Sequence, residues 1–137
     1  MTVESDADQL TAGRVDIART VTQPAGAVWQ ALISPQGTGI WLGEGAVLGG
    51  KGESYHCTDG STGVVRSYHP LEQLRVSWHA DDYAPATLIE VDLVPEGDAT
   101  TIRFQHDGIT DAGQRAVLES RWNSRLDDLA TYASGIG

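Results

Sequence analysis

Two polar side chains occupy strand positions whose neighbours on the same face are apolar, and one of them is a histidine. His106 shares its face with Ile102 and Phe104, so we expect its imidazole to point into the interior. A histidine side chain titrates near neutral pH, which suits hydrogen bonding to a ligand or general acid–base work. The alternative is a structural histidine that is hydrogen-bonded to the neighbouring backbone.

Arg19 is the second polar residue, and it falls on the face of Val15, Ile17 and Val21. A guanidinium is costly to bury unless it meets a carboxylate or a ligand anion. The carboxylates that strand position makes available are Glu53, Glu90 and Asp92. A structural ion pair and a contact with a ligand both remain open.

Large aromatic side chains could form the wall of an internal cavity. With Arg19 and His106, the candidate ligand-binding residues are Trp29, Trp41, Tyr55, Tyr68, Trp78, Phe104 and Trp122. Aromatic walls with few charged groups suit an apolar or aromatic ligand better than a sugar or a phosphate. The alternative is that the rings fill the space and leave no cavity.

The remaining motifs predict no catalytic residue, no metal ligand and no cofactor. The glycine-rich stretch at 49–52 lacks the spacing and the Ser or Thr of a phosphate loop. His56 and Cys57 are neighbours on a predicted strand, so they point to opposite faces and cannot bind one metal ion together. Cys57 has no activating base beside it, and we expect a small buried side chain.

Composition narrows the classes of partner. The chain has 137 residues, which fits one domain, and its 9 basic and 19 acidic side chains give a formal net charge of −10. Because this charge repels phosphate, we expect neither nucleic acid nor membrane as a partner. With a single cysteine, no recognisable signal peptide and no apolar stretch long enough to span a bilayer, we expect a cytoplasmic protein.

The hydropathy pattern separates an N-terminal arm from one folded domain. Residues 1–13 are polar, acidic and aperiodic, which predicts a disordered arm. Alternation that begins at Arg14 predicts a strand, and Pro24 then fits the first turn of a helix that ends at Ser34-Pro35. The glycines between positions 37 and 45 predict an irregular stretch.

Strand-like runs alternate with turn residues over the middle of the chain. They cover residues 53–58, 62–68, 74–79, 87–94 and 100–106, with one more short strand expected around 46–48. The tight turns between them imply antiparallel neighbours.

The last segment predicts one long amphipathic helix. Asp111 and Gln114 resemble a capping box, and the helix should end before Gly135. Its apolar stripe consists of Leu118, Trp122, Leu126 and Leu129. An antiparallel sheet buries such a stripe by curling around the helix, so the predicted fold class is α+β.

Four blocks of sequence resemble the START-like SRPBCC superfamily, in the branch named after the activator of the heat-shock-protein ATPase. They are residues 23–32, 74–78, 99–108 and 122–132, and they occur in the order of that family. The resemblance implies a helix-grip fold over residues 14–134, with a deep cavity that in relatives holds lipids, sterols, polyketides or plant hormones. One departure is Leu118, which stands where relatives often carry His or another polar residue.

The resemblance and the residues together predict a protein that binds a small hydrophobic or aromatic molecule in an internal cavity. A protein-binding module that assists a chaperone is one alternative. A cyclase or aromatase is another, and it would need His106 to pair with Tyr55 or Tyr68 for acid–base work. A homodimer is one option for the assembly.

Overall fold

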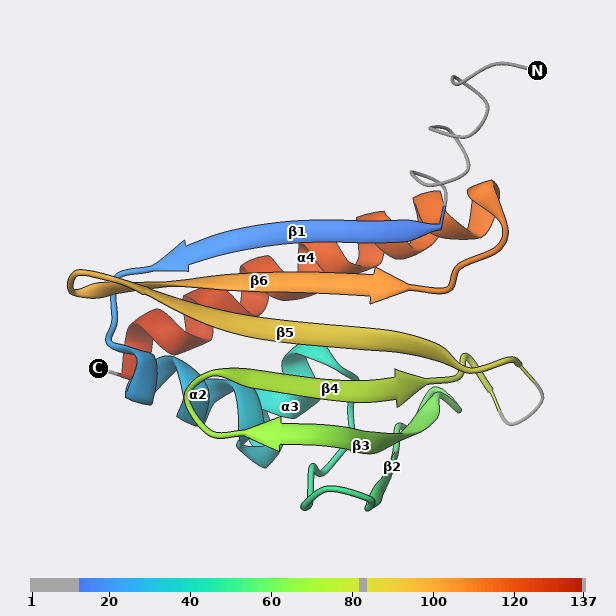
Figure 1. The fold of residues 1–137 in the computed structure, drawn as a ribbon, viewed down its shortest axis with the longest axis horizontal. Coiled ribbons are helices and arrows are strands. Elements are labelled where there is room, and N and C mark those ends of the chain that lie inside the picture. Colours follow the sequence, from blue (N-terminus) through green and yellow to red (C-terminus); the bar gives the residue numbers. More distant parts are fainter. Residues whose placement is uncertain (1–12, 82–83, 137) are drawn as a thin grey trace.

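A six-stranded antiparallel sheet with helices on one face makes up the molecule (Figure 1). The computed structural model describes residues 13–81 and 84–136, so the predicted arm at 1–13 lies almost wholly outside the described residues. The elements are β1 (Arg14–Val21), α2 (Ala25–Ile33), α3 (Pro35–Trp41), β2 (Ser54–His56), β3 (Thr62–His69), β4 (Gln73–Trp78), β5 (Thr87–Glu96), β6 (Ala99–Asp107) and α4 (Ala112–Ile136). The strand order is β1-β6-β5-β4-β3-β2.

The alternation of apolar and polar residues sets which side of each strand is buried. In β1 and β6 the register places Val15 opposite His106 and Ile17 opposite Phe104, and all four side chains are buried. The residues between them, such as Asp16 and Gln105, face the other side. The inner face of the sheet is therefore continuous from strand to strand.

The long helix α4 packs against the β1 side of this inner face, and α2 and α3 lie beside it behind the other strands (Figure 1). Asp111 begins it as predicted, because its carboxylate accepts a hydrogen bond of 2.7 Å from the backbone N–H of Gln114. The whole predicted stripe is buried, with Leu118 4% exposed and the other three residues at 1% or less. The predicted α+β helix-grip fold, a curved antiparallel sheet around the C-terminal helix, is confirmed.

Three local predictions were wrong. The helix α4 does not end before Gly135 but continues through it to Ile136. The stretch after Ser34 is helical over α3 rather than irregular, because the Ser34 hydroxyl accepts from the N–H of Gly37 at 3.1 Å and Pro35 occupies the first turn. Residues 46–48 form no strand. Position 37 requires glycine, because a Cβ there would lie 1.5 Å from the carbonyl oxygen of Ala31 at the end of α2.

The helices that the structure describes include none that is long and apolar enough to cross a membrane.

Candidate ligand-binding site between the sheet and the long helix

A chain of hydrogen bonds crosses the space between α4 and the sheet. The indole Nε1–H of Trp122 donates to Nδ1 of His106 at 3.0 Å. Since Nδ1 accepts, the ring proton lies on Nε2, which is 2.7 Å from Oγ1 of Thr87 and donates to it. Thr87 in turn donates to the carbonyl oxygen of Trp78 at 2.9 Å. All the donors and acceptors in this chain are matched.

The imidazole of His106 is neutral. Its exposed fraction is 0%, so the prediction that it faces the interior is confirmed. Burial lowers its pKa to about 4, and the nearby charge of Asp107 opposes this shift only in part. Both ring nitrogens are bonded within the protein, to Trp122 and Thr87, and neither bond goes to Tyr55 or Tyr68.

Four of the predicted aromatic residues contact one another around this chain. The ring centroids of Phe104 and Trp122 lie 5.2 Å apart, and those of Trp78 and Trp122 lie 5.8 Å apart. Trp41 contacts Phe104 at 6.4 Å, and its indole N–H is bonded to the carbonyl of Leu32 at 2.8 Å. These rings occupy the central part of the space between sheet and helix.

The other three predicted aromatic residues make separate contacts. Trp29 of α2 packs edge-on against Tyr68 of β3 with their centroids 5.5 Å apart. Tyr55 donates its hydroxyl to the carbonyl of Ser77 at 2.6 Å, and burial raises the pKa of this phenol. None of these contacts involves His106.

Arg19 is held by α4. Its Nε lies 2.7 Å from Oδ1 of Asp127, and its Nη2 donates to Oδ1 of Asn123 at 2.7 Å. The third contact is with the carbonyl of Ala18 at 2.9 Å. The partner is therefore none of the three carboxylates that strand position suggested, since Glu90 bonds to Arg75 and Asp92 to Gln73. An ion pair between strand and helix is the structural role predicted as one of two options.

A small pocket of about 60 Å³ opens beside this chain, where the ends of β4, β5 and β6 meet the start of α4. Its walls include Trp78 and Thr87 from the strands, Leu118 and Gln114 from α4, and Ile109 between them. Leu118 makes this part of the wall apolar. Of the nine residues predicted from the sequence, only Trp78 lines the pocket.

The indole N–H of Trp78 is buried and has no hydrogen-bond partner among the residues that the structure describes. The side chain lies on the inner face of β4 and is only 3% exposed as a residue. An unpaired buried donor lowers the stability of the folded state by about 1–3 kcal/mol, so a hydrogen-bond acceptor that reached it would be stabilising. This unpaired donor could not be predicted from the sequence, because strand parity predicts burial of an indole but not the partner of its nitrogen.

Metal binding finds no support within residues 13–81 and 84–136, where no group of three or more His, Cys, Asp or Glu side chains could hold an ion. His56 is exposed and Cys57 is buried, as their opposite strand faces predicted. Burial also raises the pKa of the Cys57 thiol, so it is a weak nucleophile at neutral pH.

Comparison of the sequence with known protein families identifies the family of the folded domain. The family described as Activator of Hsp90 ATPase homolog 1-like protein matches residues 22–134. The chain belongs to this family. The resemblance that the four sequence blocks carried is thereby confirmed. No curated protein sequence matches the chain.

Solved structures share the fold of this Activator of Hsp90 ATPase homolog 1-like chain. DynU16, described as a putative protein in the dynemicin biosynthetic locus, has a TM-score of 0.78 and 22% identity over 88% of this chain and 46% of its own. CalU16 from Micromonospora echinospora has a TM-score of 0.75 and 22% identity over 88% and 76%. The Aha1 dimer from Colwellia psychrerythraea has a TM-score of 0.75 and 18% identity over 88% and 96%.

These identities show a common fold and nothing finer. The chain spans less than half of the DynU16 chain, so the activity of that whole protein does not transfer.

Proposed function

We propose that the protein binds a small, neutral, hydrophobic or aromatic molecule that carries one hydrogen-bond acceptor. The binding site is the pocket beside Trp78, Thr87 and Leu118, between the sheet and the start of α4. The fold of the family supplies the architecture, in which a sheet and a helix enclose space between them.

The observation that carries the proposal is that Trp78, a residue that lines the pocket, has a buried indole N–H without a hydrogen-bond partner among the described residues. A ligand carbonyl or ether oxygen would satisfy this donor, while apolar atoms of the ligand would contact Leu118 and Ile109. Binding would then replace an unfavourable buried group by a hydrogen bond.

The charge of the site favours a neutral ligand. His106 is uncharged, and its hydrogen bond to Thr87 fixes the hydroxyl of that residue toward the carbonyl of Trp78. Arg19, the one cation predicted to face the ligand, is bonded to Asp127 and Asn123. An anionic ligand would thus find no compensating charge among these groups.

Size limits what fits the pocket in this conformation. The volume of about 60 Å³ is smaller than the roughly 150 Å³ of an apolar cavity that binds benzene, so an aromatic ring needs more space. The remaining wall consists of Ala80, Ala84, Pro85, Gly108 and Thr110, which all lie outside the strands and helices. We propose that a ligand widens the pocket on the side of Ala84 and Pro85, because Trp78, Thr87 and Leu118 on the other sides belong to strands and to α4.

Acid–base catalysis is the weaker candidate. His106 would have to exchange a proton with a substrate, yet both of its nitrogens are bonded to Trp122 and Thr87 and its pKa is about 4. A general base works best with a pKa near the working pH. Binding without chemistry is the function that this geometry supports better.

Calorimetric titration with acetophenone tests the proposal, with ethylbenzene as the matched molecule that lacks the oxygen. We expect acetophenone to bind saturably and more tightly than ethylbenzene. Trp78→Phe should remove this preference, whereas Trp29→Phe, a change in the other aromatic group, should retain it. Absence of saturable binding, or an equal affinity for both molecules, would contradict the proposal.

A further inference from the structure

A second, larger hollow lies on the opposite face of the sheet, away from the helices. It is an open groove of about 530 Å³ that crosses β3, β4, β5 and β6 near one end of the sheet. Its apolar lining consists of Val64, Ala86 and Leu88. We call it the outer groove.

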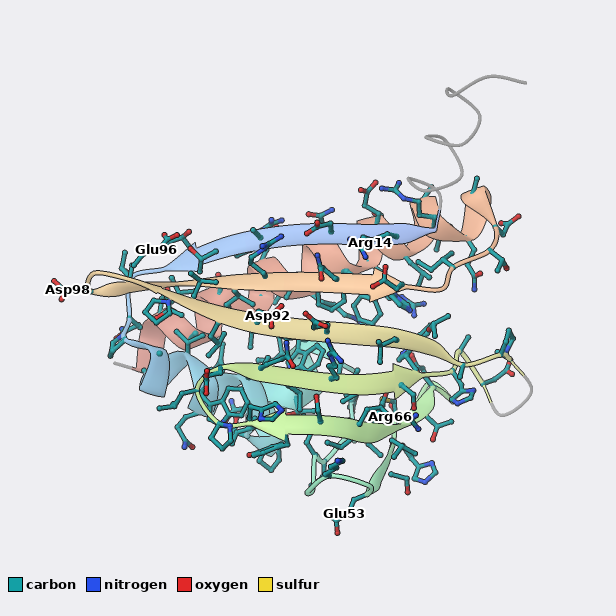
Figure 2. The ribbon with its side chains drawn as sticks, in the orientation of Figure 1. Arg14, Glu53, Arg66, Asp92, Glu96 and Asp98 are labelled. Atoms are coloured by element: carbon teal, nitrogen blue, oxygen red, sulfur yellow. The ribbon has the colours of Figure 1, made fainter. Side chains whose placement is uncertain are left out.

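Arg66 is the strong cation of the outer groove. It is the extra residue of a β-bulge, because Val65 pairs with Val76 while Ser67 pairs with Arg75. Bulges re-aim side chains, and Arg66 is exposed on β3 (Figure 2). In the part of the chain that the structure describes, its guanidinium has no hydrogen-bond or ion-pair partner.

The polar neighbours of Arg66 leave its charge uncompensated. Asp107 also lines the outer groove, but its carboxylate is bonded to Arg14 at 2.5 Å. Ser77 accepts a hydrogen bond from the backbone N–H of Val64 at 2.9 Å, which leaves its hydroxyl hydrogen free to donate. His79 donates through Nδ1 to the carbonyl of Ala84 at 2.9 Å and forms part of the wall.

We propose that the outer groove binds a small amphipathic carboxylate, with an aromatic or aliphatic body on Val64 and Leu88 and the carboxylate on Arg66 and Ser77. The uncompensated guanidinium of Arg66 favours an anionic group at this point of the surface, and it has to do so against the long-range repulsion from a chain that carries −10. Arginine presents a planar fork that matches a carboxylate. This site is distinct from the pocket beside Trp78 and goes beyond the proposed function.

Titration of the full chain with 2-naphthoate, followed by the methyl resonances of Val64 and Leu88, tests the inference. We expect saturable shifts of these methyl groups. The Arg66→Gln variant should bind about tenfold more weakly or worse, because it loses a charge-assisted hydrogen bond. Arg66 is exposed, so this variant should keep the wild-type melting temperature.

Two controls make the outcome decisive. Arg103→Gln changes an arginine of the same sheet face outside the outer groove, and it should leave the affinity unchanged. The neutral analogue 2-naphthalenemethanol should bind more weakly than 2-naphthoate. Shifts confined to the methyl groups of Leu118, unchanged affinity in Arg66→Gln, or equal affinity for the neutral analogue would overturn the inference. The proposed function of the pocket beside Trp78 is tested independently, by the preference for acetophenone over ethylbenzene.

Discussion

Trp122 of α4 donates its indole N–H to Nδ1 of His106 on β6 across 3.0 Å, with both side chains 0% exposed. This single bond joins the helix stripe to the inner face of the sheet. It also fixes the ring proton of His106 on Nε2, where it serves Thr87. The hydrogen bond that holds α4 against the sheet therefore also orients His106 toward Thr87, which lines the pocket.

Acid should weaken the fold through His106. The folded pKa of about 4 lies below the ordinary value of 6.5, so the unfolded chain binds the extra proton between these pH values. Stability from this residue is complete above pH 6.5 and is lost as the pH falls toward 4, by up to about 3 kcal/mol. Urea unfolding between pH 7 and pH 4 measures it.

The control for this effect is the matched pair His106→Gln and His56→Gln. Glutamine at position 106 offers an oxygen to Trp122 but does not titrate, so that variant should lose this part of the pH dependence. His56 is exposed, and its variant should follow the wild type. If the free energy of unfolding of His106→Gln falls with pH in parallel with that of the wild type, His106 does not cause the acid sensitivity.

Trp122→Ala should destabilise the domain by about 3–5 kcal/mol, because it removes a large buried ring from the centre of the helix stripe. Val117→Ala is the control on the same helix, at a residue that is 63% exposed. Urea unfolding should separate the two variants clearly. An unchanged midpoint for Trp122→Ala would show that the sheet does not grip α4.

Gly37→Ala should destabilise the turn between α2 and α3, by about 1–3 kcal/mol or more. Its Cβ would lie 1.5 Å from the backbone oxygen of Ala31, and backbone cannot move aside as a flexible side chain can. Gly26→Ala in α2 is the control, since a Cβ there meets nothing within 4 Å and favours the helix. Equal melting temperatures for the two variants would contradict the close contact.

The ion pair of Arg19 with Asp127 should contribute about 0.5–1 kcal/mol, because the two side chains are 28% and 64% exposed and solvent screens them. A double-mutant cycle with Arg19→Met and Asp127→Asn measures this coupling, which high salt should reduce. A coupling free energy of zero at low salt would mean that the ion pair does not stabilise the fold.

Periodicity predicted most of the fold. The stripe from Leu118 to Leu129 and the parity of His106 followed from spacing alone, because burial on one face imposes the period of each element. The helix α3 was missed, since its glycines have low helix propensity and Ser34-Pro35 was interpreted only as the end of the preceding helix, although it also begins the next one.

The details of the site depend on distant residues and could not be predicted in the same way. The partner of Arg19 lies 108 positions away on α4, where the rotation of the helix against the sheet decides which carboxylate is near. Asp127 follows directly after the stripe residue Leu126, which was the one available hint. The unpaired nitrogen of Trp78 and the pocket beside it arise from three-dimensional contacts alone.

The indole resonances of the four tryptophans in a ¹H–¹⁵N spectrum test the central claim most directly. The indole protons of Trp41 and Trp122 are already bonded within the protein and serve as references, and Trp78→Phe identifies the Trp78 signal. On addition of acetophenone, the account predicts a saturable shift of the Trp78 proton to lower field, with no such shift from ethylbenzene. A Trp78 resonance that stays in place, or that moves equally with both molecules, would contradict it.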